Sequence, residues 1–422
     1  MFDLLEADEA GLVDEIARLE RVKAAAAAAQ ARVTAALVQR RRAAEAAAGI
    51  PRRKQLRGLA SEVGLARRDS PHRGGRHLGF ATALVFEMPY TLAALECGAL
   101  SEWRATLIVR ESACLSIEDR RTLDAELCAD IAGLAGMGDK RITAAAKTIA
   151  YRLDPQAVVE RAAKAAAERT VTIRPAPDAM AYLTVLLPVA QGVGVYAACK
   201  RAADTTFDGR TRGQIMADTL VERVTGRPAE APTDIAVNLV LTDDTLLAGH
   251  PEPAHLDNYG PIPAAIARQL ITHAVADQRS KTTLRRLYRR PAPGALIAME
   301  SRARHFPTTL ARFITLRDHT CRTPYCNAPI RHTDHAQPHH HRGPTSAHNG
   351  LGACEHCYYT KESPGWQVTT TTTENGTHTA QFITPTGHHY HSTAPPPPTP
   401  KTLTLSRIAT HITINLHPYK AA

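Results

Sequence analysis

Hydrophobic and polar positions at the start of the chain follow a helical repeat. Within residues 3–50, apolar side chains recur at spacings of three and four and lead into an alanine run at 24–29. This spacing places apolar residues on one face of a helix, and alanine has the highest helix propensity. The pattern predicts one long helix or two. It also predicts a packing face or a homo-oligomer contact through these N-terminal helices.

The same helical spacing continues through residues 78–168. Ser101 and Ser116 precede two of the repeats, and each is followed within three residues by an acidic residue. A serine in this position accepts hydrogen bonds from the free N–H groups of the first turn. We therefore expect helices to begin at both serines. No residue of this stretch suggests catalysis.

A β-rich part follows. Residues 170–175 and 181–188 are β-favouring and flank a short turn, which predicts a hairpin. Residues 234–247 predict a third strand. Further helices are expected at 210–224, at 260–274, where prolines mark the start, and from about 307 to 318.

The tail is different in character. Asn375-Gly376 lies between Thr-rich runs, which is a strong hairpin signal, and the prolines of 393–400 predict a linker. The whole pattern predicts a mainly α protein with a small β element in its N-terminal region. We expect a helix-rich domain at 1–300, a metal-stabilised module at 310–368, and a hairpin with a Pro/Thr-rich tail at 369–422.

Charge adds a candidate partner. The chain of 422 residues has a formal net charge of +10. Part of it comes from a basic stretch that contains Arg40–Arg42, Arg52–Lys54, Arg57, Arg67, Arg68, Arg73 and Arg76. This stretch is either a solvated surface or a phosphate-binding face, and DNA is the partner that it suggests. No apolar stretch approaches the roughly 18 residues that a membrane span needs, so we expect a cytoplasmic protein.

The eight cysteines fall into two groups. Cys97, Cys114, Cys128 and Cys199 are isolated in helical surroundings and are expected to be buried apolar residues. Cys321 and Cys326 form one close pair, and Cys354 and Cys357 form a second. Two short-range pairs of this kind can converge on one tetrahedral Zn²⁺. Because the surrounding stretch is poor in apolar residues, this structural zinc would supply its core.

The residues between and after the pairs carry a resemblance. Asp334-His335, Asn349 and Lys361 occur in this order, and the stretch resembles the HNH, or ββα-metal, endonuclease family. The resemblance implies that Asp334 binds a catalytic divalent ion such as Mg²⁺, that His335 is the general base, and that Asn349 keeps His335 aligned. The four cysteines would form a separate structural zinc site. Arg342 and Lys361 are expected to contact DNA phosphates.

A second resemblance covers most of the chain. The chain is similar to an actinobacterial, mycobacterial repeat-type family that joins a domain of unknown function, number 222, to a C-terminal HNH module. The matching stretches are DSPHRGGRHLGFA (69–81), LSEWRATL (100–107), TFDGRTRGQIMADTL (206–220), YGPIPA (259–264), LRDHTCRTPYC (316–326) and GPTSAHNG (343–350). The family assigns no chemistry to the N-terminal domain.

One position departs from the HNH pattern. Tyr358 occupies the place where a histidine or asparagine usually binds the catalytic ion, and a neutral phenol is a poor ligand for a hard cation. His356 or one of His339–His341 is a possible replacement. The chain is therefore either an active HNH endonuclease acting on DNA, or a catalytically impaired, zinc-stabilised DNA-binding or scaffold protein.

Overall fold

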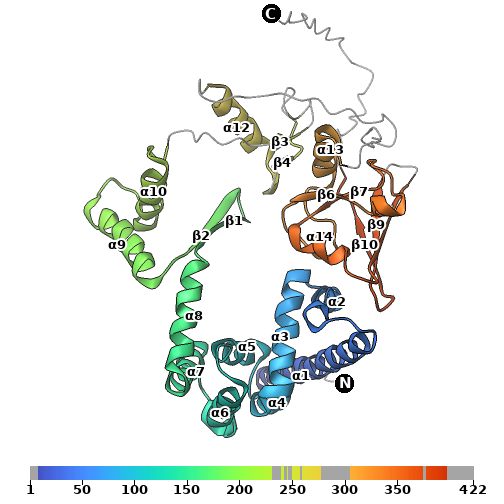
Figure 1. The fold of residues 1–422 in the computed structure, drawn as a ribbon. Helices are drawn as coiled ribbons and strands as arrows, with labels where there is room; N and C mark the ends of the chain where they lie inside the picture. The colour runs from blue at the N-terminus through green and yellow to red at the C-terminus, as the bar shows by residue number, and fades with distance from the viewer. Residues whose placement is uncertain are drawn as a thin grey trace, which may run out of the picture. The chain divides into compact units, whose positions relative to one another are not determined.

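The computed structural model describes residues 8–230, 239–241, 245, 250–256, 259–276, 305–373 and 377–396 (Figure 1). The chain divides into two compact units, one made of Met1–Ala231 with Arg286–Pro395 and the other of Pro232–Arg285 with Pro396–Ala422. Helices dominate the described part, and the sheets are small, as the sequence predicts.

The first unit begins with helix α1 (Glu9–Ala47), which confirms the predicted long helix. Its alanine-rich face is buried from Ala24 onward, and Val38 is the last buried residue of the helix. The first turns instead expose five large apolar side chains, those of Leu12, Val13, Ile16, Leu19 and Val22. The oligomer contact expected here stays a prediction.

Shorter helices follow α1. In chain order they are η1 (Arg52–Lys54), α2 (Leu59–Ala66), α3 (Pro71–Glu87), α4 (Pro89–Glu96), α5 (Glu102–Glu111), α6 (Ile117–Cys128), η2 (Ile131–Leu134), α7 (Asp139–Leu153) and α8 (Pro155–Ala167). Among them, α3, α4 and α5 pack against α1. Ser101 and Ser116 cap α5 and α6 as predicted, because their side chains accept from Arg104 N and Asp119 N. Within the described residues, no single helix is long and apolar enough to cross a membrane, although the bent pair α3 and α4 passes that test together.

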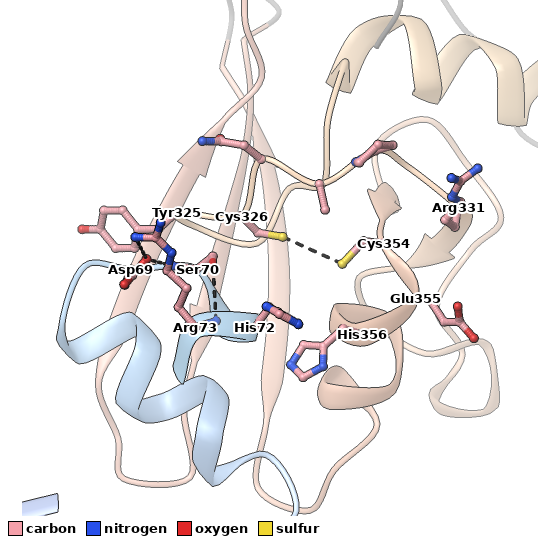
Figure 2. Close-up of a pocket in the computed structure, with 13 residues that line it drawn as sticks. Asp69, Ser70, His72, Arg73, Tyr325, Cys326, Arg331, Cys354, Glu355 and His356 are labelled. Atoms are coloured by element: carbon pink, nitrogen blue, oxygen red, sulfur yellow. Dashed lines mark hydrogen bonds and ion pairs between the residues drawn. The ribbon is translucent and has the colours of Figure 1, made fainter. Parts of the chain in front are cut away.

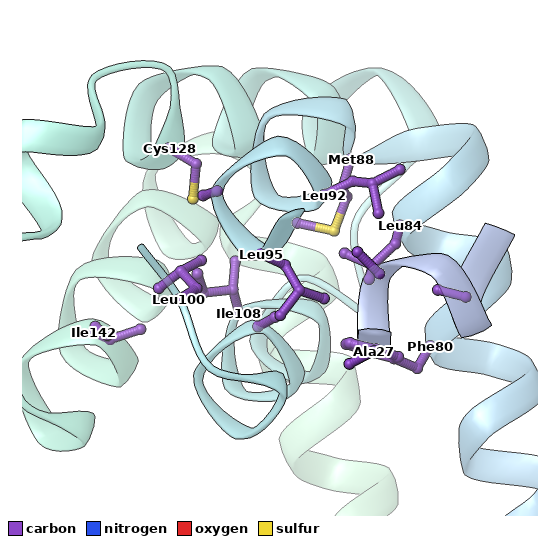
Figure 3. Close-up of a cluster of buried hydrophobic side chains, with 14 of the residues drawn as sticks. Ala27, Phe80, Leu84, Met88, Leu92, Leu95, Leu100, Ile108, Cys128 and Ile142 are labelled. Carbon is purple, nitrogen blue, oxygen red and sulfur yellow. The ribbon is translucent and has the colours of Figure 1, made fainter. Parts of the chain in front are cut away.

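The core of these helices is apolar and continuous (Figure 3). Leu84, Met88, Leu95 and Ile108 are fully buried in it. Of the four isolated cysteines, Cys128 and Cys199 are buried and Cys114 is partly buried, as expected. Cys97 is exposed, which corrects the expectation for that residue; it follows directly after α4, where the chain turns at the surface.

The predicted hairpin and helix of the next stretch are confirmed. Strands β1 (Thr170–Ala176) and β2 (Met180–Leu186) pair antiparallel, with Thr170 opposite Leu186. Helix α10 (Arg212–Thr225) begins with a reciprocal capping box between Thr211 and Gln214. The structure also contains α9 (Val189–Thr205), which the sequence did not predict. Its two glycines and several valines have low helix propensity, and only Cys199 and Ala203 of this helix are buried.

The second unit contains a three-stranded antiparallel sheet in the order β3 (Leu239–Val240), β4 (Ala254–Leu256), β5 (Gly260–Ile262). The strand predicted at 234–247 is confirmed only at β3, because Leu241 lies outside any strand and Thr245 is helical. Residues 234–238, 242–244 and 246–247 lie outside the described part. Helix α12 (Ala264–Ala276) begins four residues later than the predicted start at 260, because 260–262 form the edge strand β5. An edge strand is where a sheet tolerates a residue such as Pro261.

The C-terminal part of the first unit holds the candidate site. Its elements are α13 (Thr308–Asp318), β6 (His332–His335), η3 (His339–His341), β7 (Gly350–Ala353), α14 (Glu355–Lys361), β8 (Gln367–Thr372), β9 (His378–Ile383) and β10 (His389–Thr393). β6 pairs antiparallel with β7, and β8, β9 and β10 form an antiparallel sheet. The predicted tail hairpin is therefore confirmed as β8 and β9, although its Asn375-Gly376 turn lies outside the described residues.

The three-stranded sheet packs on the β6–β7 hairpin. Val368, Ala380 and Phe382 share one buried apolar cluster with Ala336 and Leu351. Residues beyond 368, the predicted limit of the module, thus contribute to its packing.

A buried ionic network connects α13 to this sheet. Asp318, fully buried, accepts from Arg317 and from Arg322 Nη1 at 2.9 Å. Arg322 in turn donates to the backbone oxygen of His378, and His378 Nε2 lies 2.8 Å from the oxygen of His348. Burial, together with the charge of Arg317, lowers the pKa of His378 to about 4. His378 is therefore neutral in the folded protein.

This neutral histidine predicts a loss of stability in mild acid. In the unfolded chain an imidazole titrates near pH 6.5, so between about pH 6.5 and pH 4 the unfolded state binds a proton that the folded state does not. The free energy of unfolding should fall across this window by up to about 3 kcal/mol. Denaturant unfolding of the native chain and of His378→Gln, which does not titrate, measures the effect. Parallel pH profiles would refute it.

Candidate metal centre and histidine site

Four cysteines meet in the C-terminal part. The Sγ atoms of Cys321, Cys326, Cys354 and Cys357 all lie within 4.8 Å of one another, and all four residues are buried. Four thiolates at this separation suit the tetrahedral coordination of Zn²⁺. The cluster can therefore hold a metal ion such as zinc, as the cysteine spacing predicts. In the described part of the chain, no other group of His, Cys, Asp and Glu offers three converging ligand atoms.

Local backbone geometry brings the sulfurs together. Cys321 N donates to Ala328 O and Cys326 N to Thr323 O, which folds the first pair into a tight loop. Cys354 is the N-cap of α14, and its Sγ accepts from Cys357 N. The Sγ atoms of Cys326 and Cys354 are 3.8 Å apart. Hydrogen bonds among the four thiols lower the pKa of Cys321 and Cys354 and raise the pKa of Cys326 and Cys357, because the sulfurs share protons at this short separation.

His335 ends strand β6 and is 8% exposed. Its Nε2 atom lies 2.9 Å from Thr345 Oγ1, and its ring contacts Phe306 at 4.5 Å between centroids. The ring of His339 lies 5.7 Å away. Burial lowers the pKa of His335 against the opposing attraction of Asp334. The imidazole is therefore neutral at physiological pH, the form that accepts a proton.

Asn349 holds the loop that follows His335. Its Oδ1 accepts from Gln337 N at 2.9 Å, and its Nδ2 donates to Gln337 O and Pro344 O. Its backbone oxygen accepts from Ala336 N at 2.7 Å. Gly343 permits this packing, because a Cβ there would lie 1.8 Å from Gln337 O and 2.8 Å from Asn349 Nδ2. The side-chain amide thus fixes the backbone next to His335.

Asp334 and Lys361 form a largely buried ion pair. Asp334 Oδ1 accepts from His335 N, and Lys361 Nζ lies 3.0 Å from Asp334 Oδ2 and 2.7 Å from Glu362 Oε1. The side chains of Lys361 and Asp334 are only 8% and 13% exposed. Burial acts to lower the pKa of Lys361, but the charges of Asp334 and Glu362 outweigh it and raise that pKa. The structure thus places Lys361 inside the protein, whereas a phosphate contact was expected; Arg342 is exposed.

Tyr358 packs against a histidine ring. Its ring stacks on that of His332, with centroids 4.6 Å apart and planes at 22°. The candidate replacement ligand His356 points elsewhere, since its Nε2 lies 3.2 Å from Ser61 Oγ of α2. His339–His341 form η3, and His340 and His341 stack on each other.

One carboxylate oxygen of this site is a candidate ligand for a hard cation. Asp334 Oδ2 is buried and receives no hydrogen bond of good geometry, and the ammonium group of Lys361 lies 3.0 Å from it. Mg²⁺ often binds proteins through one or two carboxylates, with water and phosphate as the other ligands. Asp334 satisfies that requirement. Tyr358 does not add a second carboxylate, amide or imidazole.

A cavity of about 950 Å³ lies between α3 and the cysteine loops (Figure 2). The cysteines at its wall are Cys326 and Cys354, and charged or ionisable side chains face it from both sides (Asp69, His72, Arg73, Arg331, Glu355 and His356). Residues of both the helical part and the metal centre therefore line this cavity.

Helix α2 also packs directly against α14. Ser61, 1% exposed, hydrogen-bonds with His356 Nε2 and with Thr360 Oγ1 at 3.1 Å. Gly58, with φ +80°, lies against Trp366, and a Cβ at this position would come within 2.5 Å of Trp366 Nε1. The sequence did not mark Ser61 or Gly58, because residues about 300 positions apart leave no local signal of their contact. α2 thereby supports the helix that carries Cys357 and Lys361.

The metal centre predicts a single bound zinc. Protein purified without chelator should contain one Zn²⁺ per chain by mass spectrometry of the metal, because all four ligands are in place. Cys326→Ser should lose the zinc and destabilise the C-terminal part. Cys97→Ser, which changes an exposed cysteine outside the cluster, should keep it. Native protein devoid of zinc would contradict the assignment.

The α2 contact predicts a stability effect. Ser61→Ala removes two hydrogen bonds at a buried position and leaves their partners unsatisfied, which should cost about 1–3 kcal/mol. Hydrogen exchange should become faster in α14. The control is Thr148→Ala on α7, since that exposed hydroxyl bonds only within its own helix. Unchanged exchange in α14 would show that α2 does not support it.

Comparison with known proteins identifies the family. A family model described as "Domain of unknown function (DUF222)" matches residues 14–318, more than half of the chain, so the chain belongs to that family. Searches of curated proteins and of solved structures each found no match.

Proposed function

We propose that this member of the DUF222 family is an HNH-type, metal-dependent endonuclease that hydrolyses phosphodiester bonds in DNA. The observation that carries the proposal is His335, a buried and neutral imidazole next to Asp334 at the end of a two-stranded hairpin. The hairpin β6–β7 is followed by helix α14, which is the element order of a ββα module.

His335 is suited to act as general base. Hydrolysis needs a group that takes a proton from water as its oxygen attacks phosphorus, while the bond to the leaving oxygen breaks. Thr345 and Phe306 hold the ring of His335, and Asn349 fixes the backbone that follows it. These contacts reduce the motion of the base, which supports proton transfer at a defined atom.

Asp334 is the residue that would hold the divalent cation, whose charge stabilises the phosphate as negative charge develops on it. Lys361 would have to leave Asp334 Oδ2 for this, and its ammonium group would then be released toward the phosphate. This exchange keeps a positive charge next to Asp334 whether or not the cation is bound.

A second function is favoured by two of the same observations. Lys361 already neutralises Asp334, and Tyr358 stacks on His332 at the position of the usual second ligand. Both fit a zinc-stabilised DNA-binding or scaffold protein in which the catalytic ion site has decayed.

Nicking of supercoiled plasmid DNA distinguishes the two functions. Zinc-loaded protein should convert the plasmid to the open-circular form with Mg²⁺, Mn²⁺ or Ni²⁺, and His335→Ala should lower the rate by about 10²–10⁴-fold, the usual contribution of a general base. Tyr358→His should raise the rate if the site lacks only a ligand.

The control variant is His391→Ala, which removes an exposed histidine of β10 that has no role in the proposed chemistry. It should nick at the native rate. Absence of nicking with every cation, or equal nicking by His335→Ala, rules out the endonuclease and leaves the scaffold.

A further inference from the structure

Most of the net positive charge of the chain lies in one short stretch. Residues 40–76 contain eleven Lys or Arg residues and three acidic residues, a net charge of +8, whereas the whole chain has +10. The stretch includes the end of α1, η1, α2 and the start of α3. Like charges concentrated in 37 residues repel one another, which lowers the stability of the fold. Binding of a partner with the opposite charge would relieve this repulsion.

The three acidic residues already have partners within the fold. Glu62 is buried and accepts from Arg41 at 2.9 Å and from the Thr386 hydroxyl. Glu45 accepts from the backbone N–H of Leu56. Asp69 pairs with His77 and, at 3.6 Å, with Arg73. They therefore do not neutralise the rest of the stretch.

The remaining cations form what we term the basic surface. All of its side chains are exposed, and within the described residues none of them forms an ion pair: Arg40, Arg42, Arg52, Arg53, Lys54, Arg57, Arg68 and Arg76. Several exposed arginines elsewhere in the chain pair with carboxylates, as Arg32, Arg104 and Arg152 do. The basic surface is thus left open to an external anion.

The position of the basic surface beside the metal module also supports anion binding there. Arg57 precedes Gly58, which contacts Trp366 just after α14. At the other end of α14, Arg73 and Arg331 face the same cavity from the helical part and from the cysteine loops (Figure 2). Cations therefore flank α14 at both of its ends.

We infer that the basic surface of the helical domain binds the phosphates of double-stranded DNA. Arginine has a planar fork of donors that matches phosphate oxygens, and seven of the eight residues are arginines. A polyanion also gains by releasing its counterions to such a surface. An anionic membrane is a poorer fit, because membrane binding needs apolar side chains beside the charges. Of the apolar residues near η1, Leu59 is fully buried and Ile50 and Leu56 are partly buried.

This inference takes its polymer, DNA, from the proposed function, but binding requires neither His335 nor hydrolysis. The test uses the full zinc-loaded chain with His335→Ala, so that DNA stays intact. Fluorescence anisotropy with a labelled 20-base-pair duplex of arbitrary sequence gives the dissociation constant over a range of salt concentrations. The surface variant carries Arg52→Gln, Arg53→Gln, Lys54→Gln and Arg57→Gln.

The matched control removes four exposed cations that also lack ion pairs in the described structure, by Lys140→Gln, Arg141→Gln, Lys147→Gln and Lys164→Gln. Both variants lose the same net charge. The surface variant should bind at least roughly tenfold more weakly near 0.1 M salt, with a log–log salt slope shallower by about 2–4. The control should stay within about twofold of the parent.

Equal weakening in the two variants would overturn the inference, since only net charge would then matter. The inference would also be overturned if the surface variant binds DNA as the parent does but no longer binds phosphatidylserine vesicles. Failure of the proposed function can be distinguished from failure of this inference. If DNA binding depends on the basic surface but the protein does not nick plasmid, only the endonuclease proposal is refuted. If the protein nicks plasmid but DNA binding does not depend on the basic surface, only this inference is refuted.

Discussion

The convergence of four buried cysteine sulfurs is the constraint on which the C-terminal part depends. Cys321 and Cys326 lie in the loop after α13, and Cys354 and Cys357 begin α14. The apolar cluster of this part has five buried members, which is little core for a segment of this length. A metal held by the four sulfurs would tie together the loop, the hairpin that carries Asp334 and His335, and helix α14, which carries Lys361.

The buried pair of Asp334 and Lys361 sets the second constraint. Two charges with little exposure are stable only when they remain paired, so anything that binds Asp334 has to displace Lys361. In the proposed endonuclease, this pair would control whether a divalent cation reaches Asp334. His335 is independent of the pair, because its contacts are with Thr345 and Phe306.

Elements with strong local signals could be predicted from the sequence. The long α1, the caps at Ser101 and Ser116 and the hairpin β1–β2 each rest on residues within a few positions of one another. The cysteine cluster was also predictable, since paired thiol spacings have few alternatives. The burial of Lys361 and the turn of His356 toward Ser61 were not, because both depend on contacts with distant elements. Helix α9 was missed because local propensity opposes it.

The helical domain therefore contributes to the module in two ways, by supporting α14 through Ser61 and by presenting exposed cations next to it. The central claim remains that His335 activates water, and chemical rescue tests it most directly. His335→Gly leaves a space beside Phe306 for a free imidazole. The account predicts that plasmid nicking by this variant is lost and returns in proportion to added imidazole. Nicking at the native rate by His335→Gly without imidazole would contradict it.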